Sequence, residues 1–153
     1  MKITIVSVGK KHDPLSSTAI EEYQKRLKQS FPIKWVFIPS SGLSGDEARR
    51  EESAKISKQL FSSAIIWLLD ETGIELASPE LSKRIELLKN SSTKDLIIII
   101  GGAYGVDSTI KQRADFVWSL SKLIFPHLLV RLILIEQLYR AQEIARGGNY
   151  HHV

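Results

Sequence analysis

Two unbroken apolar runs, AIIWLL at 64–69 and LIIII at 96–100, constrain the fold of this chain most strongly. A strand with apolar side chains on both faces must be covered on both faces, as in the parallel sheets of α/β proteins. Helix signals occupy segments of roughly ten to fifteen residues between the predicted strands. The sequence therefore predicts an α/β fold, with a mostly parallel sheet and helices on both of its faces.

The remaining elements are predicted from periodicity, caps and turn residues. Further strands are expected at 3–8, 33–37 and 116–120. Helices are expected at 14–29, at about 46–61, from about 107 and after Pro126. Another helix is expected to begin with Ser78 as its cap and Pro79 as its first helical residue. Neither an internal repeat nor a low-complexity tract nor a long linker interrupts this series. We expect a single domain over residues 1–153.

The composition narrows the possible functions. The absence of cysteine excludes disulfides, thiolate metal sites and cysteine nucleophiles, and makes the cytoplasm the expected compartment. Neither a secretory signal nor a run long enough to cross a membrane is found, and the histidine spacing predicts no metal site. The net formal charge of +4 favours a polyanionic partner. Mixed-charge runs such as GDEARREESAKISK at 45–58 are interpreted as solvated helix faces.

A glycine loop, GGAYG at 101–105, follows the second apolar run. The ligand crevice of an open parallel sheet lies at the carboxyl ends of its strands, here after residues 8, 69, 100 and 120. Glycine at such a place lets a ligand approach main-chain groups, which suits a nucleotide. The dinucleotide fingerprint belongs after the first strand, and no Walker loop is present. The sequence of the loop alone is therefore compatible with a ligand-binding slot or with a plain turn from strand to helix.

The last predicted helix is apolar on nearly every side from Leu128 to Leu138. One sheet face would not cover such a helix, so we predict a homodimer whose interface includes it. Arg131 lies inside the apolar stretch and is expected to meet a carboxylate, a phosphate or the partner chain. Glu136 and Arg140 are spaced for an ion pair within the helix, and a nucleic-acid contact is a competing interpretation for Arg140.

Several motifs together resemble the RlmH (YbeA) family of minimal SPOUT methyltransferases. They are I-G-G-x-x-G after the apolar strand, W-S-L-S-K followed by F-P-H, L-x-E-Q-L-Y-R-A in the last helix, and a terminal Y-H. The first residues, MKITIVSVGK, are also similar to the start of that family, so the resemblance covers essentially the whole chain.

The resemblance implies a deep trefoil knot, a homodimer and S-adenosyl-L-methionine as cofactor. Family members methylate N3 of a pseudouridine in large-subunit ribosomal RNA, which makes ribosomal RNA in an assembled ribosome or subunit the expected partner. By similarity, the cofactor is held by Leu69, Gly101, Leu120, Ser121, Lys122, Leu123, Ile124 and Phe125.

The resemblance also implies that Tyr150 and His151, contributed across the dimer, line the acceptor pocket together with Arg140. We expect Arg140 to contact RNA phosphate or a developing oxyanion, His151 to handle a proton and Tyr150 to stack on a base. The chain departs from the family at His152, where a lysine or arginine commonly follows Tyr-His. A histidine supplies a positive charge at that position only when it is protonated.

The residues leave two other classes of function open. One is a catalytically idle RNA-binding or ribosome-associated protein of the same fold, because a fold alone never secures activity. The other is a nucleotide-dependent enzyme such as a dehydrogenase. The missing acidic ribose-binding residue at the expected spacing counts against that alternative.

Overall fold

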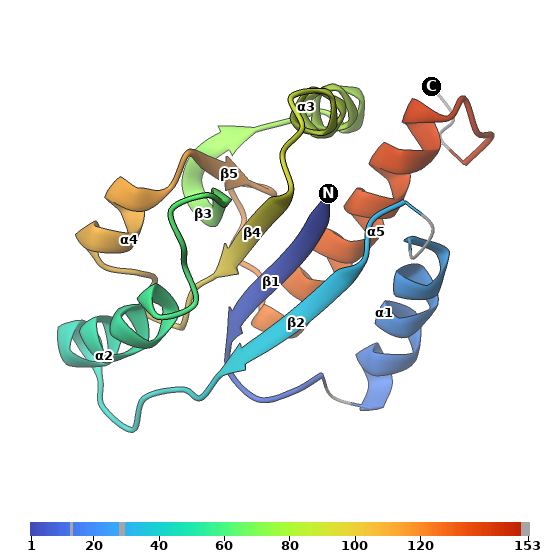
Figure 1. The fold of residues 1–153 in the computed structure, drawn as a ribbon. Coiled ribbons are helices and arrows are strands. Elements are labelled where there is room, and N and C mark those ends of the chain that lie inside the picture. Colours follow the sequence, from blue (N-terminus) through green and yellow to red (C-terminus); the bar gives the residue numbers. More distant parts are fainter. Residues whose placement is uncertain (13, 28–29, 151–153) are drawn as a thin grey trace.

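The computed structural model describes residues 1–12, 14–27 and 30–150, in which strands and helices alternate along the chain (Figure 1). The strands are β1 (Lys2–Val8), β2 (Ile33–Ile38), β3 (Ile65–Glu75), β4 (Asp95–Ile100) and β5 (Phe116–Ser119). The helices are α1 (Pro14–Leu27), α2 (Gly45–Ser57), α3 (Ser78–Asn90), α4 (Ser108–Arg113) and α5 (His127–Ala145).

The strands form one sheet in the order β2-β1-β4-β3-β5, and every neighbouring pair is parallel. β4 lies in the middle, where its residues from Leu96 to Ile100 pair with β1 on one side and β3 on the other. These residues are at most 3% exposed. The prediction of a parallel α/β sheet is confirmed.

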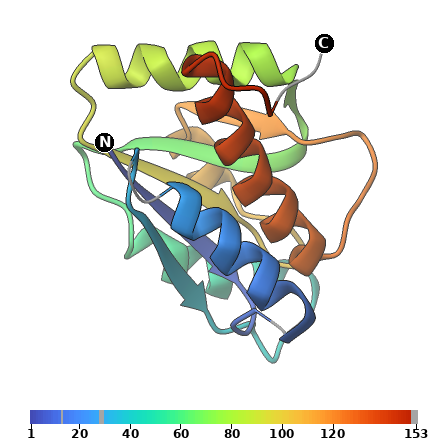
Figure 2. The ribbon, with the colours of Figure 1, turned by 90° about the vertical axis from the view of Figure 1, so that its right-hand side faces the viewer.

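A hydrophobic core lies on each face of the sheet. On one face, α1, α3 and α5 pack on the side chains of Ile5, Trp67 and Ile98; Figure 2 shows α1 and α5 side by side over the sheet. On the other face, α2 and α4 cover the alternate positions, such as Val6 and Ile99. The prediction of helices on both faces is therefore confirmed, with α5 as the central helix of the three-helix layer.

Some predicted boundaries are wrong. β3 continues to Glu75, because the chain bulges after Leu69 and then resumes pairing with β5 at Ile74. The second helix ends at Ser57 rather than near Phe61, since the following residues form tight turns. The third helix is capped by Ala77, whose N–H donates to Glu80 Oε2, so Ser78 is already helical. The predicted end of the first helix, Gln29, lies outside the described residues.

Helix α5 is only partly covered by its own chain. Leu134, Ile135 and Leu138 are fully buried, whereas Leu128 and Leu129 in the first turn are 39% and 42% exposed. The sheet, α1 and α3 therefore cover one side of this apolar helix and leave apolar surface near its start. The homodimer predicted from this helix is not tested by a single chain and stays a prediction.

Arg131 meets polar groups at the end of β1 and just after it, rather than any of the partners expected for it. The side chain is 1% exposed, and its guanidinium donates to Ser7 Oγ at 2.9 Å, Lys10 O at 2.8 Å and Val8 O at 3.1 Å. It also lies 5.1 Å from the centre of the Phe37 ring. Carbonyl and hydroxyl oxygens accept the hydrogen bonds of the guanidinium, which has donors but no acceptor. Arg131 thus fastens α5 to the end of β1.

Replacing Arg131 by Met is expected to lower the free energy of unfolding by about 3 kcal/mol, because three buried acceptors lose their donor while most of the volume is retained. Urea denaturation of both proteins measures the difference. The control is Arg26→Met, which removes an exposed arginine paired with Glu22 and should leave the unfolding midpoint unchanged. Equal midpoints for the wild type and the Arg131 variant would contradict the fastening role.

Candidate functional site

A pocket of about 540 Å³ opens beside the bulge of β3 and the carboxyl ends of β4 and β5. Its walls come from residues 68–72 of β3, from the segments that follow β4 and β5, and from the start of α5, including His127 and Val130. These are three of the four places at which the sequence predicts a site, although the strand predicted to end at Leu69 continues beyond it. The fourth, after Val8, does not line the pocket, since the guanidinium of Arg131 contacts the main chain there. The volume is within the ~300–1,000 Å³ typical of small-ligand sites.

Seven of the eight residues predicted to hold a cofactor line this pocket: Leu69, Gly101, Leu120, Ser121, Leu123, Ile124 and Phe125. The eighth, Lys122, is exposed and is not among the lining residues. The arrangement brings together three segments that are distant in the sequence. That these residues bind a cofactor stays a prediction.

The glycine loop forms a tight turn whose main chain lines the pocket. Gly105 has a φ of +72°, and its N–H donates to Gly102 O at 3.0 Å, which closes the turn. A Cβ on Gly101 would lie 3.1 Å from Val106 Cγ1, so a larger residue would crowd the base of the loop. Main-chain groups without shielding side chains are what a nucleoside ligand can approach closely.

Helix α2 holds this loop at three points. Arg49 Nε donates to Tyr104 O at 2.9 Å, and Ser53 Oγ accepts from Asp107 N–H at 2.9 Å. Between them, Glu52 is 4% exposed, and its carboxylate lies where a side chain on Gly102 would be. The interpretation of 45–58 as a solvated face is therefore wrong for Glu52 and Ser53, which are buried. The spacing of Ala48, Glu52 and Ile56 was the available signal, because residues four apart share one side of a helix.

The charged groups of the pocket are mostly paired. Burial raises the pKa of the Asp70 carboxyl, but hydrogen bonds from Thr72 and an ion pair with Lys111 Nζ at 3.2 Å outweigh it, so this pKa is lowered. Burial and the charge of Arg131 lower the pKa of His127, which favours a neutral imidazole in the pocket wall. The residues near this imidazole therefore keep it a neutral polar group.

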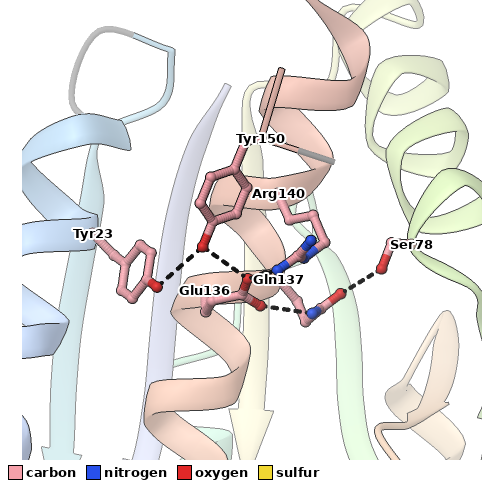
Figure 3. Close-up of polar contacts among 6 residues, drawn as sticks. All are labelled: Tyr23, Ser78, Glu136, Gln137, Arg140 and Tyr150. Carbon is pink, nitrogen blue, oxygen red and sulfur yellow. Dashed lines mark hydrogen bonds and ion pairs between the residues drawn. The ribbon is translucent and has the colours of Figure 1, made fainter. Parts of the chain in front are cut away.

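A second polar cluster surrounds Glu136 in the middle of α5 (Figure 3). Glu136 Oε1 accepts from Arg140 Nε at 3.0 Å and from the Tyr150 hydroxyl at 3.2 Å. The Arg140 guanidinium also lies 4.8 Å from the centre of the Tyr150 ring. The predicted ion pair between Glu136 and Arg140 is thus confirmed. A hydrogen bond with Tyr23, together with burial, raises the pKa of Tyr150, so its hydroxyl stays protonated at neutral pH.

This cluster and the pocket lie at different positions along α5. Arg140 follows His127 by thirteen residues, which places it ~20 Å farther along the helix axis at 1.5 Å per residue. Neither Arg140 nor Tyr150 is a lining residue of the pocket. His151 lies outside the described residues. Within one chain, the residues predicted for the acceptor are therefore separate from those predicted for the cofactor.

The described residues offer neither a metal site nor a membrane-spanning helix. In 1–12, 14–27 and 30–150, no group of three or more histidine, aspartate or glutamate side chains is arranged to hold a metal ion. No helix in the same ranges is long and apolar enough to cross a membrane.

The fold and the pocket define a parallel α/β protein with a cavity lined by main-chain loops, at the place where open parallel sheets bind small ligands. The family described as "Predicted SPOUT methyltransferase" matches residues 1–151, and the chain belongs to this family. The resemblance stated from the motifs is thereby confirmed, and with it the class of enzyme. The dehydrogenase alternative gains no support. The trefoil knot implied by the resemblance is not established by strand order and stays a prediction.

Curated relatives cover the chain from end to end. A protein of Dictyoglomus thermophilum is 40% identical over 153 residues, which cover 99% of this chain and 100% of the relative. Proteins of Cytophaga hutchinsonii and Agrobacterium fabrum are each 38% identical, covering 99% and 100% of this chain and the whole of both relatives. Each of the three is named ribosomal RNA large subunit methyltransferase H.

Replacing Gly102 by Ala is expected to lower the free energy of unfolding by about 1–3 kcal/mol, because the new methyl group would overlap the Glu52 carboxylate. Urea denaturation measures the loss. Gly42→Ala is the matched control, since a Cβ there meets nothing within 4 Å. In a Glu52→Ala background the same change at Gly102 should have a smaller effect, and an undiminished effect would argue against this contact.

Proposed function

We propose that this chain transfers a methyl group from S-adenosyl-L-methionine to N3 of a pseudouridine in large-subunit ribosomal RNA. The single observation that carries the proposal is the pocket of about 540 Å³, which is lined by seven of the eight expected cofactor residues from three separate segments of the chain. The names of the full-length relatives support ribosomal RNA as substrate. Such a substrate makes the cytoplasm the compartment of the reaction.

The residues present fit this methyl donor. Gly101, Gly102 and Gly105 leave main-chain groups open to the pocket, where an adenosine can be hydrogen-bonded by amides and carbonyls. Leu69, Leu120 and Phe125 supply apolar surface for the flat ring. When bound, the donor supplies an electrophilic methyl group on a positively charged sulfur.

The acceptor nitrogen must lose its proton and lie in line with the bond from carbon to sulfur. As the new bond from nitrogen to carbon forms, the electrons of the broken bond remain on sulfur and the proton passes to a base. In this proposal His151 handles that proton, Arg140 stabilises negative charge on the base or its phosphate, and Tyr150 stacks on the base. These roles rest on the resemblance at the matching positions.

A homodimer is part of the proposal, because Arg140, which contacts Tyr150, lies ~15–20 Å along α5 from the pocket residues Val130 and His127 of its own chain. A methyl group passes only between atoms in contact, so a second copy must bring its own Arg140 and Tyr150 to this pocket. Apolar surface for such an interface is available beside the pocket: Leu123 and Ile124 are 69% and 86% exposed, and Leu128 follows them.

The direct test is methyl transfer in vitro. Purified protein is incubated with deuterium-labelled S-adenosylmethionine and with ribosomes from cells that lack the gene, and the digested RNA is analysed by mass spectrometry. One labelled methyl group on a pseudouridine of the large-subunit RNA is expected. Calorimetric binding of the cofactor without any transfer to RNA would instead favour the catalytically idle RNA-binding alternative, and label on another nucleotide would contradict the proposed substrate.

A mixing experiment tests whether each site is shared between subunits. One variant, Gly101→Leu, fills the donor pocket, and the other, Arg140→Ala, removes a group of the acceptor site. Neither alone should methylate RNA, but random dimers of the two restore roughly a quarter of wild-type sites, because half the dimers contain one intact composite site. If each site belonged to one chain, the mixture would stay inactive. The control is each variant mixed with itself.

A further inference from the structure

Glu52 places a buried carboxylate against the glycine loop of the pocket. Its Oε1 accepts from Ser41 N–H at 2.8 Å, whereas Oε2 has no hydrogen-bond partner among the residues that the structure describes. A Cβ on Gly102 would lie 2.9 Å from the carboxyl carbon of Glu52. The carboxylate thus takes the volume of the side chain that residue 102 lacks, and Gly102 itself lines the pocket.

The charge of Glu52 is not neutralised by a neighbouring cation. Among the described parts of the chain, Glu52 forms no ion pair. The two lysine and arginine side chains that line the pocket each have another carboxylate, since Lys111 pairs with Asp70 and Arg49 pairs with Asp46 at 3.0 Å. The guanidinium of Arg131 is also buried, but it faces the carbonyls after β1.

Burial makes this charge act over a longer range than a surface charge. Exposed groups at the pocket rim, such as Glu71, are screened by water and salt, whereas a charge that is 4% exposed is screened far less. The effect reaches the pocket wall: burial and Arg131 lower the pKa of His127, and Glu52 acts in the opposite direction. The pocket therefore has a negative charge behind its glycine wall.

We infer that Glu52 determines specificity for the charge of the ligand, favouring the positively charged sulfonium of the methyl donor over the neutral thioether that remains after transfer. The inference rests on the proposed function, because it takes S-adenosylmethionine as the donor. Transfer removes the positive charge from sulfur, so the attraction to the carboxylate ends with the reaction. An enzyme that must exchange its spent donor after each turnover gains from that difference.

The test compares three ligands that differ at the sulfur position. S-adenosylmethionine has a sulfonium there, sinefungin has an ammonium group, and S-adenosylhomocysteine has a neutral thioether. Calorimetry with the full chain should find that Glu52→Gln weakens binding of the two cationic ligands by roughly tenfold, as expected for removal of one poorly screened charge. Binding of the neutral ligand should be unchanged, because glutamine keeps the shape of the side chain.

Glu51→Gln is the matched control. Glu51 is the preceding residue on α2, is 39% exposed and pairs with Lys55, so its neutralisation should leave all three affinities as they are. An equal loss for all three ligands in Glu52→Gln would overturn the inference, since it would mean that the carboxylate only supports the loop. A folded wild type that binds none of the three would overturn the proposed function and the inference together.

Circular dichroism shows whether Glu52→Gln folds. If it does not, the inference is tested with the wild type and a second variant. The wild-type protein must then bind sinefungin more tightly than S-adenosylhomocysteine, and Glu52→Asp, which keeps the charge, must retain that order. The reverse order in the wild type would overturn the inference.

Discussion

The pairing of β4 between β1 and β3 is the interaction on which the rest of the structure depends. Its residues from Leu96 to Ile100 are buried on both faces, so the sheet requires a helical layer on each side. Because all the strands are parallel, their carboxyl ends meet at one edge. The segment after Ile100 therefore lies between the bulge of β3 and the segment after β5, and its glycines fit where Glu52 and Val106 leave little room for side chains.

The apolar part of this arrangement could be predicted from the sequence. Short, unbroken apolar runs bounded by turn residues favour strands that are covered on both faces, and they correctly predicted the central strands and the helices on both faces. The extension of β3 could not be predicted, because Asp70, Thr72 and Gly73 are typical of a turn. Asp70 Oδ1 accepts from Thr72 N–H at 2.9 Å in such a turn, after which the strand resumes pairing at Ile74.

The polar contacts were harder to predict, for a physical reason. Burial of Arg131 follows from its apolar neighbours, but main-chain carbonyls accept its hydrogen bonds, and carbonyls have no sequence signature. Glu51 and Glu52 are chemically identical neighbours, yet one is paired at the surface and the other is buried against Gly102. Only the helical spacing to Ala48 and Ile56 distinguishes them. The motif residues of the pocket came from the resemblance, since glycine and leucine alone define no chemistry.

Helix α5 connects the two halves of the proposed site and also keeps them apart. Its first turns meet the pocket at His127 and Val130 and are fastened to β1 through Arg131. Its later turns carry Arg140, which shares Glu136 with Tyr150. The helix packs between α1 and α3 on the sheet, so the two halves keep a fixed separation within one chain. Under the proposed function, a complete site therefore forms only between two chains. The packing that separates the two halves in one chain also holds each half in a defined position for the other chain.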